Sequence, residues 1–166
     1  MIELLRKLAL VGAIAALAAC SQTAQDTAGA GTAGANAGAS TFPEDSVEYF
    51  TAEIGDRVFF ATDSSSLDVA AQTTLTFQAD WLLRYPDRTV VIEGHADERG
   101  TREYNLALGA RRAQAVYDYL VSLGVPASRL TTVTYGKERP VALCSNESCW
   151  SQNRRGVSVI SAGSGV

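Results

Sequence analysis

Acidic and basic side chains gather around one stretch of this chain, residues 92–112. Asp97 follows a β-branched run and a glycine, as is typical of a strand end, and a long helical pattern begins soon after it. Asn105 and Arg112 are seven residues apart in that pattern, so we expect them on one helix face with Leu108 between them. Opposite charges therefore meet at a junction between a strand and a helix.

The helical phase selects Arg112 over its neighbour Arg111. Successive helix positions are rotated by about 100°, so Arg111 points toward solvent while Arg112 adjoins the apolar stripe. A guanidinium in that position needs a partner. Asp97 and Arg112 could flank a cleft and bind the ammonium and carboxylate of a zwitterion, or they could neutralise each other. The residues alone leave both arrangements open and favour the second.

The remaining elements can be read as the scaffold for this junction. We expect helices over 45–53, 68–84 and 101–123, and strands over 57–61, 88–94, 129–135 and 156–161. Asp68 and Thr101 are the predicted N-caps of the two long helices, and Gly124 ends the second. The continuous apolar run at 90–92 predicts a strand buried on both faces. The main order, β-α-β-α-β-β, predicts an α/β sandwich with helices packed on a mixed four-stranded sheet.

The N-terminus has the composition of a targeting segment. Arg6-Lys7 precedes a ten-residue apolar stretch over 8–17, which is too short to span a membrane. Leu17-Ala18-Ala19-Cys20 resembles the bacterial lipobox, in which the cysteine becomes the acylated first residue. Ser21, where an aspartate would retain such a protein elsewhere, resembles the sorting signal for the outer membrane.

The domain organisation follows from these signals. Residues 1–19 are predicted to be a signal peptide, and 20–42 the lipidated Cys20 with a flexible linker of small residues. Residues 43–166 form the predicted folded domain. We therefore expect a lipid-anchored protein that faces the periplasm.

Charge and cysteine content limit the classes of function. A formal net charge of −4 argues against nucleic-acid binding, because no basic excess is present to neutralise phosphates. Cys144 and Cys149 enclose four residues, and an exported chain favours a disulfide between them. With one histidine in the chain and no second cysteine pair, a metal at these cysteines is not expected.

Five motifs along residues 57–160 together resemble the peptidoglycan-associated lipoproteins, a group within the OmpA C-terminal domain family. They are 94–101 (GHADERGT), 103–105 (EYN), 108–113 (LGARRA), 135–138 (YGKE) and 153–155 (NRR). The resemblance implies non-covalent binding of the peptidoglycan stem peptide at meso-diaminopimelate, with Asp97 on its ammonium and Arg112 on its carboxylate. The residues predicted to bind peptidoglycan are Asp63, Asp97, Asn105, Leu108, Arg112 and Arg155. The resemblance also implies that Asn153 and Arg154 line or support the site.

The resemblance also implies partners and a cellular role. TolB and other Tol proteins are the expected partners, in a system that holds the outer membrane to the wall during division. No cofactor is expected. Residues 62–66 depart from the family, which usually carries an aromatic residue there, and the loop between Cys144 and Cys149 is not general in the family.

Three other functions fit parts of the sequence. Glu93, His95 and Asp97 alternate and could imitate a metal site, and residues 64–66 with His95 could imitate a hydrolase triad. Gly94 breaks the strand and no nucleophile elbow is present, so we do not expect an enzyme. A porin tail or a flagellar stator subunit would need preceding strands or a retained spanning helix, and we expect neither. The last alternative is a lipoprotein that mainly docks proteins through charged residues such as Arg99, Arg102 and Glu103.

Overall fold

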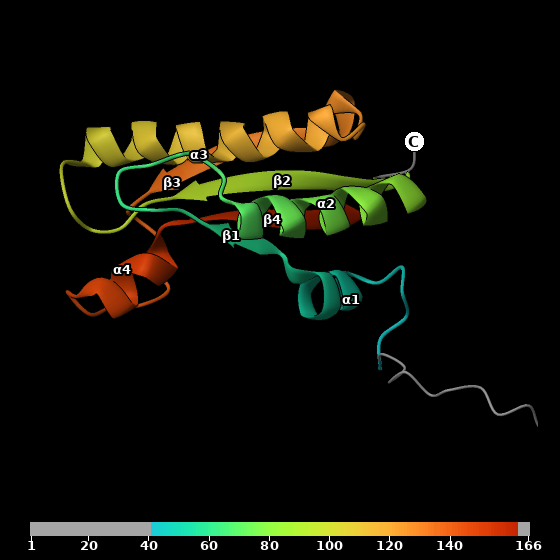
Figure 1. The fold of residues 1–166 in the computed structure, drawn as a ribbon, viewed down its shortest axis with the longest axis horizontal. Helices are drawn as coiled ribbons and strands as arrows, with labels where there is room; N and C mark the ends of the chain where they lie inside the picture. Colours follow the sequence, from blue (N-terminus) through green and yellow to red (C-terminus); the bar gives the residue numbers. More distant parts are fainter. Residues whose placement is uncertain (1–40, 163–166) are drawn as a thin grey trace, which may run out of the picture. The chain divides into compact units, whose positions relative to one another are not determined.

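Four strands form one mixed sheet in the order β1-β4-β2-β3. The computed structural model describes residues 41–162, and Figure 1 shows their arrangement. The strands are β1 (Arg57–Phe59), β2 (Arg88–His95), β3 (Leu130–Gly136) and β4 (Arg155–Ala162). The helices are α1 (Val47–Tyr49), η1 (Phe50–Gly55), α2 (Val69–Arg84), α3 (Arg102–Ser122), η2 (Ala127–Arg129) and α4 (Glu147–Asn153). The predicted signal peptide, Cys20 and nearly all of the linker lie outside the described residues.

Strand direction brings several chain segments to one edge of the sheet. β2 runs parallel to β3, and β4 runs antiparallel to both β1 and β2. The carboxyl ends of β1, β2 and β3 and the start of β4 therefore lie at the same edge. The loop from β2 to α3, the loop from β1 to α2 and helix α4 meet there (Figure 1). The predicted mixed four-stranded α/β sandwich is confirmed.

The two long helices lie side by side on one face of the sheet (Figure 1). Asp68 caps α2 and Thr101 caps α3, each accepting a hydrogen bond from a first-turn amide, as predicted. Gly124 follows α3 with φ of +97°, a conformation that glycine adopts without steric cost. The core between helices and sheet consists mainly of large apolar side chains, among them Leu75, Trp81, Leu82, Val90, Ile92, Val116 and Leu120.

The second face of the sheet is partly open, so the prediction that β2 is buried on both faces is wrong. Val91 is half-buried, and on the same face Phe59 and Val159 are 48% and 39% exposed. Alternate residues of a strand point to opposite faces. Because α2 and α3 both cover the face of Val90 and Ile92, the continuous apolar run of β2 does not have two packed sides.

Two local predictions also differ from the structure. The helix expected over 45–53 is one α-helical turn followed by the π-helix η1. Helix α4 was not expected, because its sequence has no apolar periodicity. Its stabilisation is local: Asn146 caps it by accepting a hydrogen bond from Ser148 N at 3.0 Å, and the Cys144–Cys149 disulfide closes its first turn onto the preceding loop.

Helix α3 crosses β2 at very close range. A Cβ on Gly94 would lie 1.8 Å from the carbonyl oxygen of Gly109, and a Cβ on Gly109 would lie 2.4 Å from Thr134 Oγ1. Only glycine permits this approach of helix and strand backbones. The contact fixes the first turns of α3 over the end of β2, which is where Asp97 emerges.

Candidate functional site

An open cavity of about 320 Å³ lies at the edge of the sheet where β2 ends and α3 begins. It is lined by Thr62, Asp63, Asp97, Arg99, Gly100, Tyr104, Asn105, Leu108 and Arg112. Five of the residues predicted to bind peptidoglycan are in this lining. Arg155 is the sixth, and it does not line the cavity.

Arg112 lies at the base of the cavity and is fully buried. Its Nε donates to Ser64 O at 2.8 Å, Nη1 to His95 O at 2.8 Å and Nη2 to Ala61 O at 3.1 Å. Arg111 is exposed, as the helical phase predicted. Ala61 and Ser64 lie in the loop between β1 and α2, and His95 is the last residue of β2, so Arg112 fastens α3 to that loop and to the end of the strand.

The charge of Arg112 has no carboxylate bonded to it. Among the ion pairs of residues 41–162, none includes this guanidinium. Burial lowers the pKa of Arg112 to about 10, although Asp97 and Asp63 act in the opposite direction. A guanidinium has five N–H donors, and three are used on carbonyls. Arg112 is therefore a fixed, charged donor beside a cavity, suited to an anion.

Asp97 is paired with two other arginines. Arg99 donates to it from Nη2 at 2.6 Å, from Nε at 3.2 Å and from its backbone N at 3.1 Å, and Arg154 Nη1 lies 3.4 Å from Oδ2. Burial opposes ionisation of Asp97, but the hydrogen bonds from Arg99 and Arg154 outweigh it and hold the pKa below its usual value. Asp97 and Arg112 do not neutralise each other directly.

The other predicted residues support the rim. Asn105 is buried, and its Nδ2 donates to Arg99 O at 2.7 Å and to Thr101 O at 3.1 Å, so it shapes the turn that carries Asp97. Asp63 has a left-handed φ of +54° and accepts a hydrogen bond from the Tyr104 hydroxyl. An aspartate held in that conformation at a cavity rim is consistent with a positional demand on its carboxylate.

The late arginine pair is divided between two environments. Arg154, and not Arg155, reaches the cavity side: its Nε donates to Phe60 O at 3.0 Å and its other nitrogens contact Asp97 and Glu147. Arg155 donates to Asn153 O and Arg139 O. It stands on β4 in register with Phe59, on the face of the sheet away from α3.

His95 is a buried strand-end residue. Its Nε2 lies 3.2 Å from Glu93 Oε2, and burial, together with the positive charges of Arg155 and Arg139, lowers its pKa to about 4. In the described part of the chain, no group of three or more His, Cys, Asp or Glu side chains is placed to hold a metal ion. The metal-like alternation of residues 93, 95 and 97 therefore does not form a ligand cluster.

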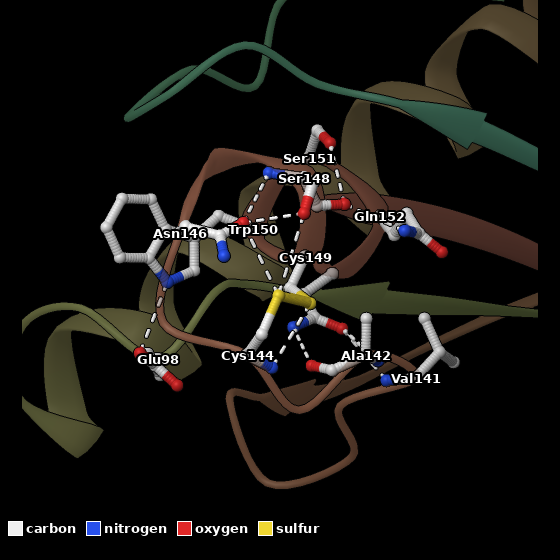
Figure 2. The surroundings of a disulfide bond; sticks show 11 residues. Glu98, Val141, Ala142, Cys144, Asn146, Ser148, Cys149, Trp150, Ser151 and Gln152 are labelled. Carbon is white, nitrogen blue, oxygen red and sulfur yellow. Dashed lines mark hydrogen bonds between the residues drawn. A yellow bond between two sulfur atoms is a disulfide. The ribbon is translucent and has the colours of Figure 1, made fainter.

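The predicted disulfide is present. Cys144 and Cys149 are joined, with their Cα atoms 5.5 Å apart, and Figure 2 shows the bond between the loop before α4 and the helix itself. Trp150 follows on the same helix, and its indole N–H donates to Glu98 Oε1 at 3.2 Å (Figure 2). The arginine at position 99 was visible in the sequence as a charge two residues from Asp97. The resemblance also implied a role for Arg154, whereas its contact with Asp97 and the contributions of Glu147 and Trp150 depend on long-range folding.

Comparison with known proteins identifies the family. Residues 59–154 match the OmpA family. A peptidoglycan-associated lipoprotein of Agrobacterium fabrum is 57% identical over 145 residues, which is 87% of this chain and 81% of that protein. The chain belongs to the OmpA family, among the peptidoglycan-associated lipoproteins.

Solved structures agree with this assignment. The crystal structure of the peptidoglycan-associated lipoprotein from Burkholderia pseudomallei superposes with a TM-score of 0.65 at 41% identity, covering 69% of this chain and 98% of that one. The C-terminal domain of Helicobacter pylori MotB has a TM-score of 0.60 at 21% identity, covering 64% and 84%, and shares the fold. For this OmpA-family chain, residues 41–162 contain no helix that is long and apolar enough to cross a membrane.

Proposed function

We propose that this chain is an outer-membrane lipoprotein that binds peptidoglycan non-covalently and thereby links the membrane to the cell wall. The ligand is the side-chain end of meso-diaminopimelate in the stem peptide. Cys20 carries the lipid, and the cavity at the end of β2 receives the amino acid. The relatives named as peptidoglycan-associated lipoproteins support the wall as the ligand.

One observation carries the proposal: Arg112 is a buried cation without a bonded carboxylate, and it shares a cavity with the anionic Asp97. A ligand that bears a carboxylate and an ammonium matches both charges. Arg112 donates to the carboxylate, Asp97 accepts from the ammonium, and Asp63 adds negative charge at the rim. Leu108 provides an apolar surface for the methylene chain between them. None of these roles requires a nucleophile or a metal, so we propose binding and not catalysis.

The same arrangement implies selectivity between wall chemistries. A stem peptide with lysine in place of diaminopimelate offers the ammonium but not the carboxylate. Arg112 would then have no anionic partner in a site from which the bound ligand has excluded water. The loss of one partner of a buried charge pair costs about 2–5 kcal/mol in binding free energy. Lysine-type walls should bind poorly.

Pull-down with isolated sacculi tests the proposal. The wild-type domain should be retained on diaminopimelate-type sacculi, and Asp97→Asn should lose at least about tenfold in affinity, because the charge that holds the ammonium is removed. Asp118→Asn is the matched control: Asp118 is exposed on α3 and lies outside the cavity. Retention of Asp97→Asn at the wild-type level would exclude this site as the wall-binding site.

We also propose that TolB and other Tol proteins are partners in envelope integrity and division. Arg102 and Glu103 at the exposed start of α3 lie beside the cavity and offer charged contacts to a protein. If wall fragments and TolB use one surface, soluble stem peptide will displace TolB in a competition assay. Simultaneous binding would assign TolB to a separate surface.

A further inference from the structure

The carboxylate proposed to receive the ligand ammonium is already occupied by a cation of this chain. Arg99 binds both oxygens of Asp97 through its side chain and adds a third hydrogen bond from its backbone N. The Asp97 side chain is 9% exposed and that of Arg99 is 39% exposed. Arg99 thus lies on the solvent side of Asp97, which is the side from which a ligand must enter.

The second cation on Asp97 has a different character. Arg154 is 6% exposed, its Nε is fixed to Phe60 O at 3.0 Å, and Glu147 holds its Nη2. It contacts Asp97 from the buried interior of the domain. Of the two arginines, Arg99 is the one that can leave the carboxylate without unpacking the domain.

Contacts outside Asp97 hold Arg99 in this position. Its guanidinium lies 4.2 Å from the centre of the Trp150 ring, and Nη2 lies 3.3 Å from Thr62 Oγ1. Trp150 is itself held by Glu98 and is carried on the helix that the disulfide closes (Figure 2). A cation over an aromatic face is attracted to the ring. The tryptophan therefore restricts Arg99 to the region above Asp97.

We propose that Arg99 is an internal counter-ion that competes with the ligand ammonium for Asp97, and that Trp150 is the residue that positions it. This inference rests on the proposed function, since it assumes that Asp97 receives an ammonium. An incoming ammonium exchanges one cation for another at Asp97 and gains little by itself. The pairing weakens by the same factor every ligand that places an ammonium on Asp97. Discrimination against simple amines comes from Arg112, which only a ligand with a carboxylate can satisfy.

The ion pair between Arg99 and Asp97 also lowers the apparent affinity of the site for its ligand. The observed dissociation constant equals the intrinsic one divided by the fraction of molecules in which Asp97 is free. Removing the competing charge should raise that fraction. The displaced guanidinium has acceptors nearby, because Glu98 and Glu147 both interact electrostatically with Arg99.

The decisive variant is Arg99→Met, which keeps much of the side-chain length and removes the charge. Its affinity for a soluble stem peptide ending in meso-diaminopimelate, measured by isothermal titration calorimetry, should be about tenfold higher than that of the wild type. A peptide ending in lysine should gain the same factor from its lower starting affinity. Arg111→Met makes the same change in net charge on an exposed part of α3 and should leave affinity unchanged.

A third ligand separates competition from a steric effect. A stem peptide ending in 2-aminopimelate carries the carboxylate for Arg112 but lacks the ammonium. Arg99→Met should not tighten its binding. Tighter binding of this peptide, or unchanged or weaker binding of the diaminopimelate peptide, would overturn the proposal.

Trp150 variants test the positioning role. Trp150→Leu should bind the diaminopimelate peptide about threefold more tightly, because the cation–π contact that holds Arg99 is lost. Trp150→Phe keeps an aromatic face and should remain near the wild type. If Trp150→Leu tightens binding even in an Arg99→Met background, the tryptophan does not act through Arg99.

The same variants distinguish a failure of the proposed binding site from a failure of the proposed competition by Arg99. If Asp97→Asn binds as well as the wild type, both the site assignment and this inference fall. If Asp97→Asn loses binding while Arg99→Met gains none, the site stands and only the competition is wrong.

Discussion

The two charged walls of the cavity are built in opposite ways. Arg112 is buried and bonded to three backbone carbonyls, with no carboxylate in contact. Asp97 is bonded to two arginines, one of them 39% exposed. The fold holds Arg112 in place but leaves its positive charge without a carboxylate. The negative charge of Asp97 is already paired with Arg99, a side chain that can move.

Because of this difference, Arg112 contributes to the stability of the fold as well as to ligand binding, whereas the contact between Arg99 and Asp97 affects mainly ligand binding. Backbone carbonyls hold a guanidinium in place without cancelling its charge, so the Arg112 wall serves the fold and the ligand together. The Asp97 wall can exchange one cation for another without loss of packing. Substitutions on the two sides should therefore have different signatures, large and structural on one and small and ligand-dependent on the other.

The largest effect is expected for Arg112→Met. Loss of the guanidinium leaves three carbonyls without their donor and releases the loop at Ser64 and the end of β2 at His95 from α3. We expect the free energy of unfolding to fall by about 3 kcal/mol, measured by urea denaturation. The matched change Arg111→Met should alter it by less than about 0.5 kcal/mol. Equal stabilities of the two variants would show that Arg112 does not fasten the loop and the strand end to α3.

A smaller effect should follow from pH at His95, whose backbone carbonyl accepts a hydrogen bond from Arg112 and whose side chain lies beside Glu93. The pKa of His95 is about 4 in the folded chain and 6.5 ordinarily, so the unfolded chain binds more protons between these values. The contribution of neutral His95 is complete above about pH 6.5 and is lost as the pH falls toward 4. Stability should drop by about 2 kcal/mol between pH 7 and pH 5.

The control for this pH effect is His95→Gln. Urea midpoints measured across that range should vary much less in this variant than in the wild type, whatever its stability at pH 7. An equally steep pH dependence in both proteins would assign the proton uptake to another group.

The smallest change in the free energy of unfolding is expected for removal of the disulfide at the start of α4, the helix that carries Trp150. The Cys144–Cys149 bond closes a short loop, so replacing both cysteines with serine should cost at most about 2 kcal/mol in the free energy of unfolding. Binding of the diaminopimelate peptide should persist and, if Trp150 is loosened, tighten by up to about threefold. Loss of binding in the double serine variant would mean that α4 contributes to the site directly.

Local chemistry was sufficient for much of the fold. The caps at Asp68 and Thr101 and the glycine after α3 set the limits of both long helices. The 100° rotation between successive helical residues was enough to bury Arg112 and expose Arg111. These features depend on neighbours within one turn of the chain, so they can be read from sequence.

Only the tertiary structure decided which charged side chains contact one another. Asp97 meets Arg154, which is 57 residues away, because β4 starts at the edge where β2 ends. Arg155, which was also predicted to bind the ligand, points to the other face, since neighbouring strand residues alternate. Trp150 reaches Glu98 because a disulfide and an asparagine cap form a helix that has no apolar period. The sequence determined which residues are charged and which helix face they occupy. The order of the strands and the Cys144–Cys149 disulfide determined which arginines pair with Asp97, and Arg112 is therefore the cation that remains available to a ligand.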